Sequence, residues 1–266
     1  MNRKILLLLN ACLLIVTSSA FAASHQDTIS KKSGTSTVAI LELYTSEGCS
    51  SCPPAERYLK TMNEKYADSK QYIPLAFHVD YWDYIGWEDP FSNPAHGVRQ
   101  RDAAQRNQLN SLYTPQFILH GKDFPAFRNI PEAIEIVNKI KPAASIQVDT
   151  SLLNDNQLNT KIIVNAENER AKNFSNVYIA ISENNLSSQI TDGENEGQQL
   201  HHDHVVRKFL GPFKLQGQSQ LNIQEKIKLD QQWKLADLNL IVFAQDSEKG
   251  ATHQAIQIPL KNLQKK

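Results

Sequence analysis

The stretch TVAILELYTSEGCSSCPPAE, from Thr37 to Glu56, decides which fold we expect for this 266-residue chain. Its first nine residues are mostly apolar and β-branched, which predicts a strand buried on both faces. Two cysteines, Cys49 and Cys52, follow in a short loop, and two prolines come directly after them. Because proline is favoured in the first turn of a helix, the stretch predicts a buried strand, a cysteine loop and a helix start.

The segments after this stretch continue the alternation of helices and strands. They predict a helix over Pro54–Tyr66, a strand over Tyr72–Val79, an aromatic-rich loop over Asp80–Pro94 and a helical stretch over Ala95–Leu109. Two hairpin strands, Phe117–His120 and Phe124–Arg128, then flank Gly121-Lys122-Asp123, and a last helix opens at Pro131. This order favours an α/β thioredoxin-like domain over residues 37–142, with a mixed sheet flanked by helices.

The pattern changes after Pro142, where short β-rich runs are separated by turn residues without a convincing long helix. The runs are IQVDTSLL, LNTKIIVNA, NVYIAIS, LNIQEKIKL, LNLIVFAQD and HQAIQIPL. Several of them alternate apolar and polar residues, as strands with one buried face do. We therefore expect an all-β, sandwich-like C-terminal domain over residues 143–266.

The N-terminus resembles a secretory signal peptide over residues 1–22, with cleavage after Ala22 and an expected periplasmic or secreted location. Its apolar run is shorter than the roughly 20 residues of a membrane anchor. A lipoprotein signal with Cys12 as the lipidated residue is a further alternative. Residues 23–36 are polar and without apolar periodicity, which predicts a flexible leader. The balanced charge, 28 basic against 28 acidic residues, gives no indication of nucleic-acid binding.

Cleavage would leave Cys49 and Cys52 as the only cysteines, in a compartment where thiols can be oxidised. A disulfide between them closes a very short loop and so stabilises the fold little. The helix start after Cys49 favours a thiolate there, through free amide groups and the helix dipole. We therefore predict that Cys49 is the more exposed nucleophile and that Cys52 is the resolving thiol.

Two further features are candidates for the same chemistry. Glu42 lies within the buried strand, where a carboxylate could take up or return a proton near Cys52, although it could also meet water or a basic partner at a strand edge. Thr114-Pro115 precedes the strand from Phe117. A cis proline at this place would face the cysteine pair and present backbone to an extended substrate.

A metal site is the rival interpretation of the cysteine pair. The thiolates could supply half of a zinc or copper site, but no second ligand pair lies nearby in the sequence. The histidine cluster of LHHDH, with His201, His202 and His204, would complete the site only if the second domain folds back onto the first.

The loop after the second strand is rich in aromatic residues that either line a substrate groove or pack beneath the loop: Tyr81, Trp82, Tyr84, Trp87 and Phe91. His78 ends the second strand and has no particular claim to catalysis. The acidic residues among the aromatic ones make no recognised metal pattern: Asp80, Asp83, Glu88 and Asp89.

Taken together, SEGCSSCPPAE, FHVDYWDYIGWEDPFS and YTPQFILHG resemble the exported thioredoxin-like family known as domain of unknown function 1223. The resemblance extends from about Val38 to the C-terminus and includes ENEGQQLHHDHVVR. It implies a thioredoxin-like domain followed by a β-rich domain, with no settled activity. Ser-Ser between the cysteines and the longer gap from Cys52 to Pro115 depart from thioredoxin itself.

Two hypotheses of different classes follow. The first is a thiol-disulfide oxidoreductase that needs no cofactor, acts on protein or small-molecule thiols and disulfides, and uses Cys49, Cys52, Glu42 and Thr114-Pro115. The second is a non-catalytic envelope-binding module in which Cys49 and Cys52 form an inert disulfide. The metal site remains a third alternative.

Overall fold

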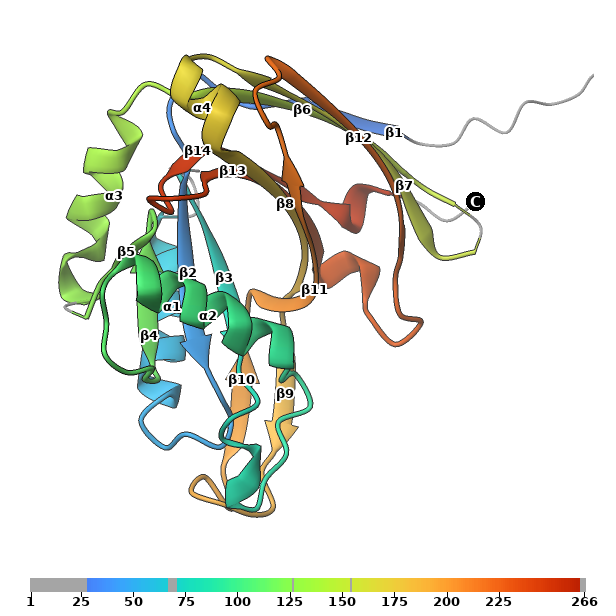
Figure 1. Ribbon diagram of the computed structural model, residues 1–266. Coiled ribbons are helices and arrows are strands. Elements are labelled where there is room, and N and C mark those ends of the chain that lie inside the picture. Colours follow the sequence, from blue (N-terminus) through green and yellow to red (C-terminus); the bar gives the residue numbers. More distant parts are fainter. Residues whose placement is uncertain (1–27, 67–70, 126, 154, 264–266) are drawn as a thin grey trace, which may run out of the picture.

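One mixed sheet of eight strands runs through the computed structural model of this protein and joins both halves of the chain (Figure 1). The structure describes residues 28–66, 71–125, 127–153 and 155–263. The expected signal peptide over residues 1–22 lies outside the described residues. Among the described residues, no helix is both long enough and apolar enough to cross a membrane.

The strands of this sheet come from the whole length of the chain. They are β2 (Ala39–Thr45), β3 (Tyr72–His78), β4 (Gln116–Leu119), β5 (Lys122–Asp123), β8 (Ser175–Glu183), β11 (Val205–Lys214), β13 (Leu238–Asp246) and β14 (Thr252–Pro259). Their order across the sheet is β14-β13-β8-β11-β3-β2-β4-β5. β2 lies parallel to β3 and antiparallel to β4, so the predicted buried strand is central to the first half.

The two halves of the chain meet between β3 and β11, which pair in parallel with Ala76 opposite Val205. The amide of Ala76 donates to the carbonyl of His204 at 2.9 Å. We expected separate domains over residues 37–142 and 143–266, but this junction makes their strands one continuous sheet. The pairing joins residues far apart in the chain, so no local sequence pattern predicts it.

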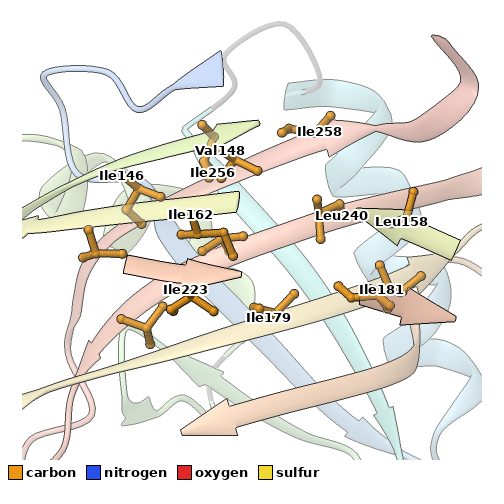
Figure 2. Packing of buried hydrophobic residues seen from close by; sticks show 14 of the residues in the cluster. Ile146, Val148, Leu158, Ile162, Ile179, Ile181, Ile223, Leu240, Ile256 and Ile258 are labelled. Atoms are coloured by element: carbon orange, nitrogen blue, oxygen red, sulfur yellow. The ribbon is translucent and has the colours of Figure 1, made fainter. Parts of the chain in front are cut away.

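A second sheet covers the C-terminal part of the large one. Its strands are β1 (Thr28–Lys32), β6 (Ala144–Leu152), β7 (Gln157–Ala166) and β12 (Gln220–Lys228), in the order β1-β6-β7-β12. Branched aliphatic side chains of the two sheets meet in a buried cluster, in which Ile146 and Ile162 face Ile179 and Leu240 (Figure 2). The sandwich-like packing expected of the C-terminal half is therefore present. One of its two layers is the large sheet, which also contains the strands of the first half.

Helices cover both faces of the first half of the large sheet. The α-helices are α1 (Pro53–Tyr66), α2 (Pro94–Arg106), α3 (Ile130–Asn138) and α4 (Glu169–Phe174), and the 3₁₀ helices are η1 (Asp83–Ile85), η2 (Phe127–Asn129), η3 (Leu235–Asp237) and η4 (Leu260–Asn262). Leu41 and Leu43 of β2 pack against α1 and α3, whereas Ile40 and Tyr44 lie in the cluster that includes Ala103 of α2. Because side chains alternate along a strand, β2 presents different residues to α1 and to α2.

Two expectations need correction, and several elements were not predicted. Residues 28–32 of the expected flexible leader form β1, an edge strand from which only Ile29 packs against the core, so its apolar signal is weak. The hairpin partner of β4 is Lys122–Asp123 rather than Phe124–Arg128, because the chain already turns at His120 and Gly121, both with positive φ. We also did not predict α4, β11 or the hairpin of β9 (Leu186–Gln189) and β10 (Gln199–His202).

Candidate functional site

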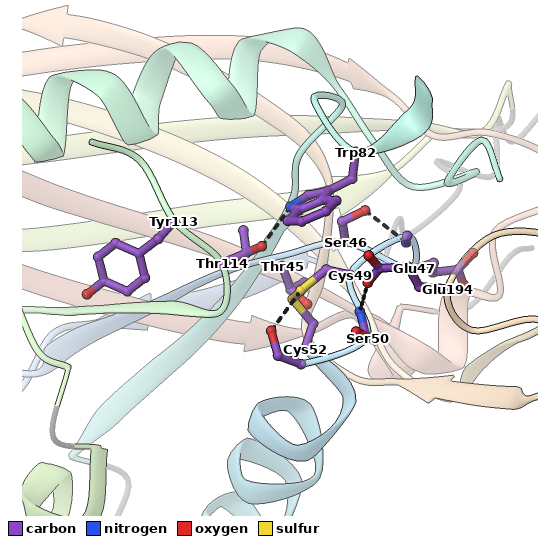
Figure 3. Close-up of a disulfide and its surroundings, with 12 residues drawn as sticks. Thr45, Ser46, Glu47, Cys49, Ser50, Cys52, Trp82, Tyr113, Thr114 and Glu194 are labelled. Carbon is purple, nitrogen blue, oxygen red and sulfur yellow. Dashed lines mark hydrogen bonds between the residues drawn. A yellow bond between two sulfur atoms is a disulfide. The ribbon is translucent and has the colours of Figure 1, made fainter. Parts of the chain in front are cut away.

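Cys49 and Cys52 form a disulfide directly before α1, with their Cα atoms 5.4 Å apart (Figure 3). The loop is tightly turned, because the amide of Cys49 bonds the carbonyl of Ser46 and the amide of Cys52 bonds the carbonyl of Cys49. The next residue, Pro53, opens the helix as the sequence indicates. The pair therefore lies where amide groups of the first helical turn can stabilise a thiolate.

Both cysteines are buried, with 1% of Cys49 and 0% of Cys52 exposed. We predicted that Cys49 is more exposed than Cys52, but in the structure neither cysteine is open to solvent. Ser50 and Ser51 between them are exposed, and the Ser51 hydroxyl lies 3.3 Å from the Cys49 sulfur. The loop thus reaches the surface through its serines, while the disulfide lies beneath other residues.

Trp82, from the aromatic loop, packs against the cysteine loop. A Cβ atom on Gly48 would come within 3.1 Å of the Cβ of Trp82, so the missing side chain allows this close approach. The indole nitrogen of Trp82 donates to the Thr114 hydroxyl at 2.8 Å (Figure 3). Trp82 therefore connects the cysteine loop to the segment before β4.

The Thr114–Pro115 peptide bond is cis, as expected. The next residue, Gln116, pairs with Tyr44 at the end of β2, which places the proline at the same end of the sheet as the cysteines. Thr114 and Pro115 are partly exposed. An extended chain could therefore reach this backbone at the surface.

Glu42 is buried as predicted, but it makes an ion pair with Arg99 of α2. Arg99 donates to both carboxylate oxygens, at 2.9 Å from Nε and 2.6 Å from Nη2, and the Tyr44 hydroxyl donates to Oε2 at 2.6 Å. Burial lowers the pKa of Arg99, but the Glu42 carboxylate outweighs it and raises the pKa overall. Because α1 packs on the opposite face of β2, our prediction that Glu42 serves Cys52 is not supported by its position.

Other acid and base groups lie beside the cysteine loop. Glu47 precedes the pair by two residues, and Glu56 lies one helical turn after Cys52, with its amide bonded to the Cys52 carbonyl. The His202 imidazole lies between the two carboxylates, with Nε2 at 2.8 Å from Glu47 and Nδ1 in contact with Glu56. Glu47 and His202 are fully enclosed, and the Glu56 side chain is 11% exposed.

A second imidazole completes this cluster. His78, at the end of β3, bonds Asp89 through Nδ1 at 2.7 Å, and both side chains are fully buried. The ring centroids of His78 and His202 are 5.0 Å apart, and Phe91 packs against both rings. The pairing of β2 with β3 places Thr45 opposite His78. The Thr45 hydroxyl donates to the Glu56 carboxylate at 2.6 Å, which holds Glu56 near this end of the two strands.

The carboxylates and imidazoles of the cluster shift one another's pKa values. Burial lowers the pKa of His202, but the Glu56 and Glu47 carboxylates outweigh it and raise this pKa to about 10. Burial raises the pKa of Glu56, but attraction to His202 outweighs it and leaves this pKa below its usual value. Asp89 behaves likewise, because attraction to His78 and hydrogen bonds outweigh burial and lower its pKa. The cluster therefore holds carboxylates and imidazolium together at neutral pH.

The histidines of LHHDH separate in the structure. Along β10 the exposure alternates, so His202 points inward and His201 outward. His204 is buried next to β3, and burial lowers the pKa of its imidazole to about 4. Of the three histidines, only His202 joins the cluster. It reaches the cluster because the second half of the chain folds back onto the first, as the metal interpretation required.

The segment between β9 and β10 also contacts the cysteine loop. Asn195, which is 1% exposed, donates to the carbonyls of Glu47 and Cys49 at 2.7 and 3.2 Å. The carboxylate of Glu194 accepts the Ser50 amide at 3.1 Å. The C-terminal half of the chain therefore holds the cysteine loop through its backbone groups.

Sequence reasoning missed most of this cluster because its members lie far apart in the chain. Two signals were present. Glu47 and Glu56 flank the cysteines at short spacing, and the period of two in QLHH separates His202 from His201. Asp89 belonged to an acidic set with no recognised metal pattern, and the structure gives it a partner in His78.

The family model described as "Protein of unknown function (DUF1223)" matches residues 40–245. The chain belongs to this family. Its match covers the cysteine loop, the aromatic loop and the β9–β10 hairpin, so the family resemblance expected from the sequence is confirmed. No protein with curated annotation matches the sequence.

Two solved structures share the fold. Protein AGR_C_4864 from Agrobacterium tumefaciens superposes with a TM-score of 0.62 at 21% identity, over 88% of this chain and 99% of that chain. HBP35 of Porphyromonas gingivalis superposes with a TM-score of 0.65 at 15% identity, over 87% of this chain and 78% of that chain. At these identities the likeness concerns the fold alone.

Proposed function

We propose that this protein is an exported thiol-disulfide oxidoreductase whose first half is thioredoxin-like. The observation that carries the proposal is the Cys49–Cys52 disulfide at the start of α1, with Thr114 and Pro115 at the same end of the sheet. A helix start lowers the pKa of a cysteine thiol, and a cysteine pair with two residues between its members can exchange its disulfide with a partner.

In the reduced protein, the Cys49 thiolate attacks a partner disulfide, so that one partner sulfur leaves as a thiolate and a mixed disulfide forms. The Cys52 thiolate then attacks the Cys49 sulfur and releases the second partner sulfur. The partner gains two electrons, and the Cys49–Cys52 disulfide forms. Run in reverse, two partner thiolates reduce Cys49–Cys52 and leave with a disulfide between them.

The enclosed disulfide sets a condition on this chemistry. A partner sulfur must approach in line with the Cys49–Cys52 bond, so residues that bury the two cysteines must move aside. Full burial of both cysteines is also the observation that favours the second candidate function, a binding module with an inert disulfide.

Trapping of partners by Cys52→Ala separates the two functions. Without the resolving thiol, a redox-active Cys49 should attack partner disulfides and accumulate mixed disulfides with one partner sulfur, visible as higher-mass bands that disappear on reduction. The double variant Cys49→Ala/Cys52→Ala is the matched control and should trap nothing. A Cys52→Ala protein that forms no mixed disulfide, even with a small disulfide such as oxidised glutathione, supports the inert module instead.

Export is part of the same proposal and has its own test. If residues 1–22 are a signal peptide, the mature protein recovered from the periplasm or medium should begin at Ala23. N-terminal sequencing checks this, and a mature chain that retains residues 1–22 would contradict export by cleavage.

A further inference from the structure

Three side chains with metal-ligand chemistry meet beside the cysteine loop, and the proposed redox chemistry does not use them. His78, His202 and Glu56 each offer one ligand atom, and these atoms lie within 4.8 Å of one another. The metal alternative raised by the sequence needed the two thiolates. This group contains no sulfur, and it draws on β3, β10 and α1.

His78 Nε2 is the atom that points to a ligand. The side chain is 0% exposed, and among the described residues Nε2 has no hydrogen-bond partner. A buried polar atom without a partner costs free energy, and native proteins rarely leave one unused. A cation bound at Nε2 would remove that cost.

The other nitrogens of the two imidazoles are already occupied by carboxylates. Asp89 holds His78 Nδ1 at 2.7 Å, and Glu47 holds His202 Nε2 at 2.8 Å. Both carboxylates are themselves fixed, since Asp89 accepts the Glu47 amide and Glu47 accepts the Trp87 indole N–H. Metal-binding histidines commonly have such partners, which fix the tautomer and leave one nitrogen for the metal.

The charge of the cluster also favours a cation. Three carboxylates, Glu47, Glu56 and Asp89, lie in this mostly buried region, and the basic partners found for them in the described part of the chain are imidazoles. Buried carboxylates need compensating positive charge. A divalent ion would supply it among the three of them.

We propose that His78 Nε2, His202 Nδ1 and one carboxylate oxygen of Glu56 bind a divalent transition-metal ion, with Zn²⁺ as the best match. Zinc takes nitrogen and oxygen ligands at about 2.0–2.2 Å, often three from the protein in a tetrahedral site with a fourth position open. Ligand atoms in such a site are about 3.3–3.6 Å apart. Binding therefore replaces the hydrogen bond between His202 and Glu56, and the three side chains shift until their ligand atoms reach this spacing.

Such a site would fasten β10 to β3 and α1. The segment that follows β9 contains Asn195, which bonds the Cys49 carbonyl, so the metal would also hold this segment over the disulfide. The site stands apart from the proposed redox function because it uses neither cysteine.

Zinc titration of the chelator-treated full-length protein, in competition with a chromophoric chelator, tests the proposal. We expect one equivalent of Zn²⁺ per chain and a loss of at least about 100-fold in affinity for His202→Ala. His201→Ala, on the exposed face of the same strand, should bind as the wild type does. Cys49→Ser/Cys52→Ser should also bind normally, which excludes a thiolate site whether or not the pair is redox-active.

The conservative variant Asp89→Asn keeps all three ligands and carries the test if His202→Ala does not fold. We expect its zinc affinity to fall about 10–100-fold, because His78 loses the carboxylate that orients it. The proposal is overturned if the wild type binds no zinc, if Asp89→Asn binds as tightly as the wild type, or if the double serine variant loses the metal.

Discussion

Two buried groups of charged residues lie on opposite faces of β2, and they are built differently. On the α2 face, Glu42 and Arg99 form a bidentate ion pair, and Tyr44 donates a further bond to Glu42. Four aromatic rings surround the guanidinium: Phe77, Tyr178, Phe209 and Phe243. On the α1 face, three carboxylates share two imidazoles, and His78 Nε2 stays without a partner among the described residues.

The difference separates a structural use of buried charge from a chemical one. The Glu42–Arg99 pair satisfies its own charge and joins β2 to α2, so it has nothing left for a ligand or a proton. The cluster of Glu47, Glu56, His78, His202 and Asp89 lies beside the disulfide and keeps an unused nitrogen. A buried carboxylate is therefore a weak sign of redox function until its partner is known.

The largest effect should come from breaking the closed pair. Arg99→Leu leaves Glu42 buried without a counter-charge, so we expect the free energy of unfolding to fall by about 3–5 kcal/mol. Urea denaturation measures this loss. Lys60→Leu, which removes an exposed ion pair with Asp203, is the control and should cost under about 1 kcal/mol. Equal costs for the two variants would show that the α2 pair is not structural.

A smaller effect is expected where the C-terminal half holds the cysteine loop. Asn195→Ala removes two hydrogen bonds to the carbonyls of Glu47 and Cys49, so unfolding should become easier by about 1–3 kcal/mol. Hydrogen exchange should quicken in residues 47–52. Glu196→Ala, at an exposed neighbouring position, should change neither quantity. Unchanged exchange in Asn195→Ala would mean that this segment does not restrain the loop.

Access to the disulfide should depend on Trp82. Trp82→Ala keeps the Cβ atom that lies against Gly48 but removes the indole ring that donates to Thr114. We expect dithiothreitol to reduce the disulfide about tenfold faster, equivalent to about 1.4 kcal/mol in activation free energy. Tyr84→Ala is the matched control, because Tyr84 belongs to the same loop and is 82% exposed. Equal reduction rates in both variants would contradict a covering role for Trp82.

The smallest effect is expected from Glu42 on thiol chemistry. Glu42→Gln should weaken the fold, but the folded variant should be reduced within about twofold of the wild-type rate, a difference of about 0.4 kcal/mol. Stopped-flow reduction below the denaturation midpoint measures this rate. A reduction rate at least tenfold lower than that of the wild type would support the proton-transfer role that the sequence indicated for Glu42.

Local patterns were sufficient for much of the first half. The continuous apolar run gave β2, the prolines and helical spacing gave α1, and YIPLAFHV gave β3, each to within about two residues. The cis bond at Pro115 followed from its place before β4.

Long-range pairing was beyond these patterns. β11 joins β3 through Val205 and Ala76, and His202 meets Glu56 from the far half of the chain. The sequence also could not predict which helix Glu42 faces. Alternation along β2 assigns its side chains to two faces of the sheet, but it does not say which face α1 covers.

The reduction potential of Cys49–Cys52 tests the central claim, that this disulfide is redox-active, most directly. Equilibration of the wild-type protein with dithiothreitol or glutathione buffers gives the potential from the fraction of reduced thiols. We predict a value between about −120 and −270 mV, the range of thiol-disulfide oxidoreductases. A value below about −300 mV, typical of structural disulfides, would contradict the proposed function.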